Sequence, residues 1–164
     1  IVLTYGCGIV SKEIIDACSG NVYGSHQGLP QYYRGSGSNF FAYLNREASF
    51  MGVSMHVLDA GIDTGFVVKQ KCLLPTVSDT YYTYSSRLII ETINMYLALV
   101  EKIENNSEAE IELFSLQTVG KLYQRKHFTP QILEDMLMLQ LTNSFYDEYH
   151  RSIKNNGTAS LVGL

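Results

Sequence analysis

Two loops in this sequence hold titratable side chains among glycines, an arrangement that suits a site for proton transfer. The first loop, over 24–35, reads GSHQGLPQYYRG and carries His26 and Arg34. The second, DAGIDTG, carries Asp59 and Asp63. A carboxylate beside an imidazole orients the ring and raises its basicity, so His26 and an aspartate could act as a proton-transfer pair. From spacing alone, a surface or capping histidine and a turn-forming aspartate explain the same residues.

The elements that must position these loops predict an α/β fold with a mixed sheet and flanking helices. The apolar run Ile1 to Tyr5 predicts a buried strand, and Ser11 begins a short helix. Asn21-Val-Tyr predicts a short strand, and the first loop follows directly after it. The strands predicted over 52–58 and 66–74 flank the second loop, so we expect them to pair antiparallel. Ligands of open α/β sheets gather where loops leave the strand ends.

Three more helices are predicted after the first loop. They run from Ser36 to about Arg46, from Ser78 to about Glu104, and from Thr129 to about Lys154. The predicted buried stripe of the long helix is Leu88, Ile89, Thr92, Ile93, Tyr96, Leu97 and Val100. We expect residues 1–154 to form one α/β domain that lacks its first strands, because a buried first strand needs neighbours. Residues 155–164 are predicted to be a flexible tail.

The composition excludes several classes of protein. With 164 residues and 46% hydrophobic residues, the chain is long enough for one domain with a hydrophobic core. The net charge of −4 argues against a nucleic-acid partner. No apolar run approaches the roughly 18 residues of a membrane span. The three cysteines form no C-x-x-C pair and no zinc spacing, which favours a reduced, cytoplasmic setting.

The two loops resemble motifs of the folate-dependent formyltransferases, which include methionyl-tRNA, glycinamide ribonucleotide and sugar N-formyltransferases. The segment GVSMHVLDAGIDTG, over 52–65, is similar to the family signature G-V-T-x-H-x-x-D-x-G-x-D-T-G. The segment HQGLPQYYRG, over 26–35, is similar to the family loop H-x-G-L-x-P-Y-Y-R-G, with Pro and Gln slightly shifted. The resemblance covers roughly Val2 to Pro75, with a weaker echo over 120–130.

This resemblance implies a partial Rossmann-like formyltransferase fold and a role for each matching residue. His26 and Asp63 match the catalytic histidine and aspartate, and no metal is needed. The residues that match the segments holding the pterin end of 10-formyltetrahydrofolate are Tyr5, Gly6, Asp59, Ala60, Gly61 and Ile62. Residues beside the acceptor are Arg34, Gly35 and Asn39. Arg34 could equally fix its own loop, and His56 is expected to be a hydrogen-bonded core histidine.

One departure from the family pattern concerns the oxyanion. The family has Asn-x-His, whereas Gly24 stands two residues before His26. A second alignment places Asn21 and Tyr23 on that pattern, but it loses the histidine and breaks the spacing to Arg34. Losing one oxyanion donor typically costs about 10²–10³ in rate.

Four functions remain open from the sequence. The first is formyl transfer from 10-formyltetrahydrofolate to a small-molecule amine, with an amino-sugar nucleotide preferred. The others are hydrolysis of the same donor, formylation of methionyl-tRNA, and a degenerate module that binds or dimerises without catalysis. The helices predicted over 78–104 and 129–154 offer a face for a homodimer, although core packing explains their apolar residues equally well.

Overall fold

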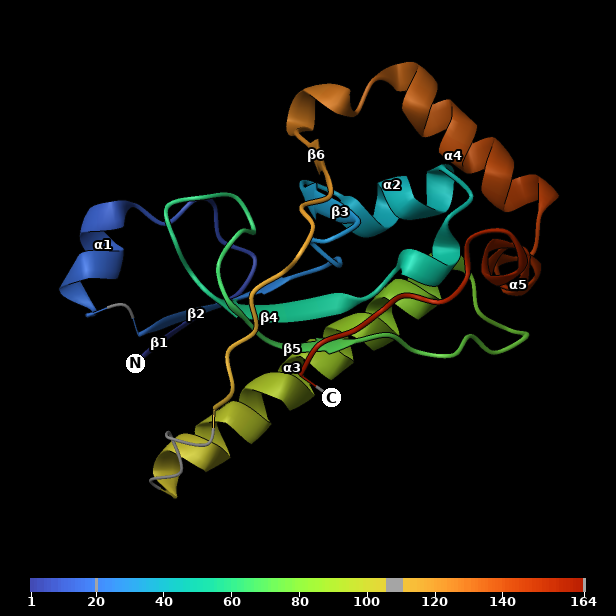
Figure 1. The fold of residues 1–164 in the computed structure, drawn as a ribbon. Coiled ribbons are helices and arrows are strands. Elements are labelled where there is room, and N and C mark those ends of the chain that lie inside the picture. Colours follow the sequence, from blue (N-terminus) through green and yellow to red (C-terminus); the bar gives the residue numbers. More distant parts are fainter. Residues whose placement is uncertain (20, 106–110, 164) are drawn as a thin grey trace.

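A four-stranded mixed sheet forms the centre of the fold (Figure 1). The computed structural model describes residues 1–19, 21–105 and 111–163. The strands lie in the order β1 (Val2–Thr4), β2 (Val22–His26), β4 (Val53–Val57) and β5 (Val67–Lys71). β1 runs parallel to β2, whereas β4 is antiparallel to both β2 and β5. The predicted α/β class, and the predicted antiparallel pairing around the second loop, are confirmed.

β1 lies at the edge of the described sheet, which corrects the expectation of a buried strand over Ile1 to Tyr5. Leu3 and Tyr5 are exposed, and Val2 and Thr4 are half-buried. Apolar composition predicts the strand itself, but it does not reveal how many neighbours the strand has. The helix predicted next is present as α1 (Lys12–Ala17), which begins after Ser11.

The long helix α3 (Tyr81–Glu104) covers one face of the sheet (Figure 1). Its buried residues are Tyr84, Leu88, Thr92, Met95 and Leu99. The predicted stripe is therefore right at Leu88 and Thr92 but wrong at Ile89, Ile93 and Leu97, which are exposed. The helix is apolar on more than one side, and periodicity alone does not show which side meets the sheet.

A second, two-stranded parallel sheet joins the first loop to a distant segment. β3 (Tyr33–Gly35) pairs with β6 (Lys121–Tyr123). The short helix α2 (Ser38–Leu44) follows β3, and 3-10 turns lie at η1 (Ala48–Phe50) and η3 (Arg125–His127). The ring of Phe41 on α2 stacks on Tyr123, with centroids 3.8 Å apart. This stacking fixes the end of β6 beside the loop that carries His26.

The last predicted helix is in fact two helices. α4 (Pro130–Thr142) begins after Thr129, as expected, and α5 (Phe145–Asn156) follows it. Asn143 is extended, and the side chain of Ser144 accepts a hydrogen bond from the backbone N–H of Asp147. Such a cap begins a new helix, because it satisfies a backbone donor that lacks a helical partner.

The segment after α5 is hydrogen-bonded to the rest of the fold, contrary to the flexible tail predicted over 155–164. The backbone N–H of Gln70 on β5 donates to the carbonyl of Val162 at 3.1 Å. The hydroxyl of Ser49 donates to the carbonyl of Gly157. Leu164 lies outside the described residues. Within the described part of the chain, no helix is long and apolar enough to cross a membrane.

Candidate active site

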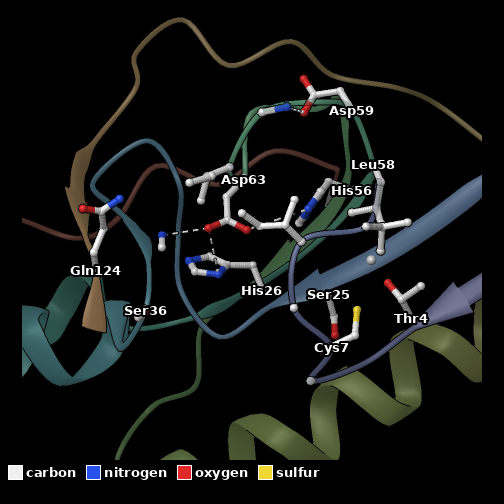
Figure 2. Close-up of a pocket in the computed structure, with 18 of the residues that line it drawn as sticks. Thr4, Cys7, Ser25, His26, Ser36, His56, Leu58, Asp59, Asp63 and Gln124 are labelled. Atoms are coloured by element: carbon white, nitrogen blue, oxygen red, sulfur yellow. Dashed lines mark hydrogen bonds and ion pairs between the residues drawn. The ribbon is translucent and has the colours of Figure 1, made fainter. Parts of the chain in front are cut away.

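A cavity of about 460 Å³ lies against β1, β2 and β4 (Figure 2). The two predicted loops and the segment after β1 form most of its wall, and the end of β6 closes one side. Its lining includes Thr4, Gly6, Cys7, Gly24, His26, Gly35, His56, Leu58, Asp59, Asp63 and Gln124. The histidine loop and the aspartate loop meet here as predicted, but not for the predicted reason: β2 and β4 are antiparallel, so the loops that follow them leave the sheet at opposite ends.

His26 and Asp63 meet inside this cavity. Nδ1 of His26 lies 3.3 Å from Oδ2 of Asp63. The backbone N–H of Gly35 donates to the same carboxylate oxygen at 2.7 Å. Both side chains are largely buried, with 9% of the His26 side chain and 17% of the Asp63 side chain exposed. The alignment that keeps His26 in the catalytic position is supported, because Tyr23, its rival, packs in the hydrophobic core.

The second nitrogen of His26 faces a backbone carbonyl, with Nε2 lying 3.4 Å from the oxygen of Tyr33. Burial lowers the pKa of His26 below its ordinary value, although the Asp63 carboxylate and the Tyr33 carbonyl act in the opposite direction. A backbone carbonyl only accepts, so this contact places a proton on Nε2. In the neutral ring Nδ1 then holds the lone pair, and this nitrogen lies beside the Asp63 carboxylate.

Asp63 is held in an unusual backbone conformation. Its φ of 52° lies in the left-handed region, which aspartate tolerates better than most residues. The loop before it is closed by Asp59, whose carboxylate accepts from the backbone N–H of Gly61 and from the hydroxyl of Thr64. Arg34 donates to the carbonyl of Ile62 at 3.3 Å. These contacts fix the direction of the Asp63 side chain.

His56 lies on the other side of the Asp63 carboxylate (Figure 2). Its Nε2 is 4.0 Å from Oδ1 of Asp63. Its Nδ1 is buried and has no hydrogen-bond partner. Burial lowers the pKa of His56 to about 4, so the ring is neutral near pH 7. His56 is therefore buried, as expected, but it lines the cavity, and its buried Nδ1 lacks the hydrogen bond expected of a core histidine.

The place of the missing asparagine is filled by Leu58. A Cβ atom added to Gly24 would lie 2.5 Å from Cδ2 of Leu58 and 3.2 Å from Oγ1 of Thr4. An asparagine at position 24 therefore requires the Leu58 side chain to move. Asn39 is no substitute, because its amide bonds both the N–H and the carbonyl of Gly52 and is buried.

The predicted binding residues divide into two groups. Those that line the cavity are Gly6, Gly35, Asp59, Gly61 and Ile62. Those that do not line it are Tyr5, Arg34, Asn39 and Ala60. Arg34 donates to the carbonyls of Ile62 and Gly120, which are the contacts of a loop-fixing residue. Asn39 joins α2 to the start of β4, so its position is set by packing rather than by the cavity.

Several lining residues carried no signal that sequence reasoning used. Thr4 and Cys7 stand in and after β1, and Tyr123 and Gln124 stand at the end of β6. The weak family echo over 120–130 was the one available hint for the last two. Gly28 was missed as well: a Cβ there would lie 2.5 Å from Nε2 of His26, so only glycine leaves room for this ring position.

Known proteins were compared with the chain by sequence and by structure. No family model matches the chain. A methionyl-tRNA formyltransferase of Prochlorococcus marinus (strain MIT 9515) is 24% identical over 92% of this chain and 45% of its own length. That of Thermodesulfovibrio yellowstonii is 29% identical over 63% of this chain and 33% of its own length. The chain spans 30% to 45% of the length of the curated relatives it matches.

The fold is shared with solved formyltransferases. PseJ from Anoxybacillus kamchatkensis, in complex with UDP-4,6-dideoxy-4-formamido-L-AltNAc and tetrahydrofolate, matches 96% of this chain and 77% of its own, with a TM-score of 0.62 and 20% identity. A sugar N-formyltransferase from a Shewanella species matches 84% and 58%, with a TM-score of 0.64 and 19% identity. Phosphoribosylglycinamide formyltransferase from Bacillus halodurans matches 63% and 53%, with a TM-score of 0.54 and 22% identity. The chain therefore shares its fold with solved formyltransferases, and its sequence is distantly similar to methionyl-tRNA formyltransferases.

Proposed function

We propose that this cavity transfers a formyl group from 10-formyltetrahydrofolate to the amine of an amino-sugar nucleotide. The observation that carries the proposal is the buried contact between His26 and Asp63 at the cavity wall, with Nδ1 and Oδ2 3.3 Å apart. Because Nε2 faces the Tyr33 carbonyl, Nδ1 is the nitrogen of His26 that can act as a base beside Asp63.

His26 and Asp63 divide the proton transfer between them. The bound donor supplies a formyl carbon that the amine attacks and a nitrogen that leaves. Nδ1 of His26 accepts the proton that the attacking amine loses as the new C–N bond forms. It returns this proton to the leaving nitrogen as the old C–N bond breaks, giving a formamide and tetrahydrofolate. Asp63 stabilises the imidazolium that exists between the two transfers.

The residues present suit a folate donor. The cavity volume of about 460 Å³ falls in the range of small-molecule sites. A pterin ring carries alternating hydrogen-bond donors and acceptors along one edge. Backbone groups can match them where glycines leave the chain open, as at Gly6, Gly8 and Gly61 in the lining. Nδ1 of His56 adds one buried acceptor without a partner.

The amino-sugar acceptor is proposed from two considerations. PseJ was solved with a nucleotide-linked formamido sugar and tetrahydrofolate, and its fold matches most of this chain. The net charge of −4 does not favour a tRNA, which binds through phosphate contacts with basic residues. Methionyl-tRNA is the second acceptor to test, since the sequence relatives are methionyl-tRNA formyltransferases. We place the reaction in the cytosol, in keeping with three free cysteines.

The proposal is tested by following tetrahydrofolate release from 10-formyltetrahydrofolate by absorbance. Parallel reactions contain a UDP-linked amino sugar, methionyl-tRNA or no acceptor. We expect release that depends on the amino sugar, and a loss of about 10²-fold or more in His26→Ala. His150→Ala, on the exposed face of α5, is the matched control. Release that needs no acceptor indicates hydrolysis, and release only with the tRNA reassigns the acceptor.

A second function is favoured by the contact around position 24. Because Leu58 fills the space beside Gly24, the site lacks the asparagine amide that the resemblance to Asn-x-His predicts at the oxyanion. A module that binds the folate without turning it over is the function this observation favours. Binding of 10-formyltetrahydrofolate by calorimetry, combined with no release under any condition, would establish that function and exclude the enzyme.

A further inference from the structure

The Asp63 carboxylate is flanked by two buried histidines, and formyl transfer as proposed above uses only one of them. His26 approaches Oδ2 from β2, and His56 approaches Oδ1 from β4, at 3.3 Å and 4.0 Å. The two rings lie on opposite sides of the carboxylate (Figure 2). Oδ2 already accepts the N–H of Gly35, whereas Oδ1 has no such backbone partner among the described contacts.

The position of His56 is fixed by the sheet and not by a hydrogen bond. Within the sheet it is paired with Gly24 on β2 and Val67 on β5, neither of which is charged. The titratable groups that face its ring are Asp63 and Asp59 from the loop and His26 from β2. Only 3% of His56 is exposed, so bulk water cannot supply a hydrogen-bond partner to a ring nitrogen that lacks one in the protein.

The two ring nitrogens of His56 have different surroundings. Nε2 faces a carboxylate oxygen, and Nδ1 is buried without any partner. A neutral histidine has one N–H donor and one acceptor nitrogen. A proton on Nε2 can be donated to the Asp63 carboxylate. A proton on Nδ1 would have no acceptor, and the lone pair of Nε2 would then face the lone pairs of the carboxylate oxygen. The Nε2–H tautomer is therefore the stable one.

We propose that His56 is a positioning residue, whose Nε2–H holds Oδ1 of Asp63 so that Oδ2 stays aligned on His26. The proposal rests on the proposed function, because it assigns His56 a part in the same reaction. The distance of 4.0 Å exceeds that of a hydrogen bond in the structure, and hydrogen bonds of this kind tighten when ligand fills the site. A neutral His56 also keeps the one positive charge of the reaction on His26.

The tautomer can be read without any activity. Long-range ¹H–¹⁵N spectra of the uniformly ¹⁵N-labelled protein distinguish the two tautomers, and variants of single histidines assign the four rings. We expect the Nε2–H tautomer for His56 at pH 7, with this preference weakened in Asp63→Asn. A His56 ring with its proton on Nδ1, or a charged ring at pH 6, overturns the proposal. This result stands even if the protein forms no product.

Two substitutions separate a positioning role from a packing role. The amide N–H of Gln reaches the place of Nε2, and that of Asn reaches the place of Nδ1. We expect His56→Asn to lower kcat about 10-fold or more with a smaller change in KM, and His56→Gln to recover most of that loss. Equal kcat in the two variants, when both are as stable as each other by denaturant unfolding, contradicts the positioning role. If the wild-type protein forms no product, the proposed function fails, and the tautomer alone decides the role of His56.

Discussion

Oδ2 of Asp63 lies 3.3 Å from Nδ1 of His26. His26 ends β2 and Asp63 lies in the loop after β4; these strands are antiparallel, so the loop of Asp63 must fold back along the sheet to reach His26. The tautomer of the neutral His26 ring is set by its other nitrogen, because Nε2 must carry a proton to donate to the carbonyl of Tyr33.

Gly28 is predicted to be essential for the position of the His26 ring. A Cβ at this position would lie 2.5 Å from Nε2 of His26 and 2.5 Å from Cβ of Ser38. We expect Gly28→Ala to lower the free energy of unfolding by about 1–3 kcal/mol through overpacking. We also expect it to reduce formyl transfer by at least about 10-fold, because the ring must move away from the reacting atoms.

The control for this change is Gly8→Ala, since a Cβ at Gly8 would meet no atom within 4 Å. Its free energy of unfolding should match that of the wild type within about 0.5 kcal/mol. Urea denaturation of both variants checks the prediction. A Gly28→Ala protein with wild-type stability and wild-type rate would show that the His26 ring lies elsewhere.

Restoring the missing amide should raise the rate. Gly24→Asn alone places a side chain against Leu58, whose terminal carbon lies 2.5 Å from the new Cβ. The double variant Gly24→Asn/Leu58→Ala removes this contact and supplies an amide donor near His26. We expect the double variant to exceed Leu58→Ala in kcat, by up to about 10²–10³-fold if the amide reaches the oxyanion.

This comparison uses Leu58→Ala as its reference, because that change removes the packing without adding the amide. The same tetrahydrofolate release assay measures all three variants. If the double variant is no faster than Leu58→Ala, position 24 does not face the reacting carbonyl, and the likeness to Asn-x-His has no catalytic meaning here.

Stability is predicted to fall as the pH drops below about 6.5. The pKa of His56 is about 4 in the folded protein because of burial, and the unfolded chain has the ordinary value near 6.5. Below pH 6.5 the unfolded state therefore binds the proton more readily, and stability is lost until the pH passes through the folded pKa. The pKa of His26 is lowered by burial too, so it acts in the same direction.

The contribution of His56 is measured by urea denaturation at pH 7.0, 5.5 and 4.5. We expect the wild type to lose up to about 3 kcal/mol more than His56→Gln over this range, because glutamine does not titrate. Parallel pH dependence in the two proteins would show that His56 is accessible to protons in the folded state.

The sequence predicted the centre of the site better than its surroundings. His26 and Asp63 were recognised because short motifs carry them, and each motif sits directly after or before a strand with a clear apolar pattern. The strands that lie against the cavity were predicted for the same reason. Such local patterns can be read from a single sequence, because the alternation of apolar and polar neighbours indicates the secondary structure of that segment.

What the sequence did not predict depends on contacts between distant segments. Tyr123 and Gln124 reach the cavity because β6 pairs with β3. No local sequence pattern predicts the pairing of these two distant segments. The buried face of α3 was misplaced since both of its faces are apolar, and only the sheet decides between them. The break at Ser144 was missed because its cap interrupts an otherwise continuous helical pattern.

The central claim is that formyl transfer by this chain requires the contact between Asp63 and His26, in which the carboxylate stabilises the imidazolium. The most direct measurement is the rate of tetrahydrofolate release with a UDP-linked amino sugar, in the wild type and in Asp63→Asn. We predict measurable release in the wild type and at least about 100-fold slower release in the variant, because asparagine cannot stabilise the imidazolium. Equal rates in the two proteins, or no release by the wild type with any acceptor or with water, would contradict the claim.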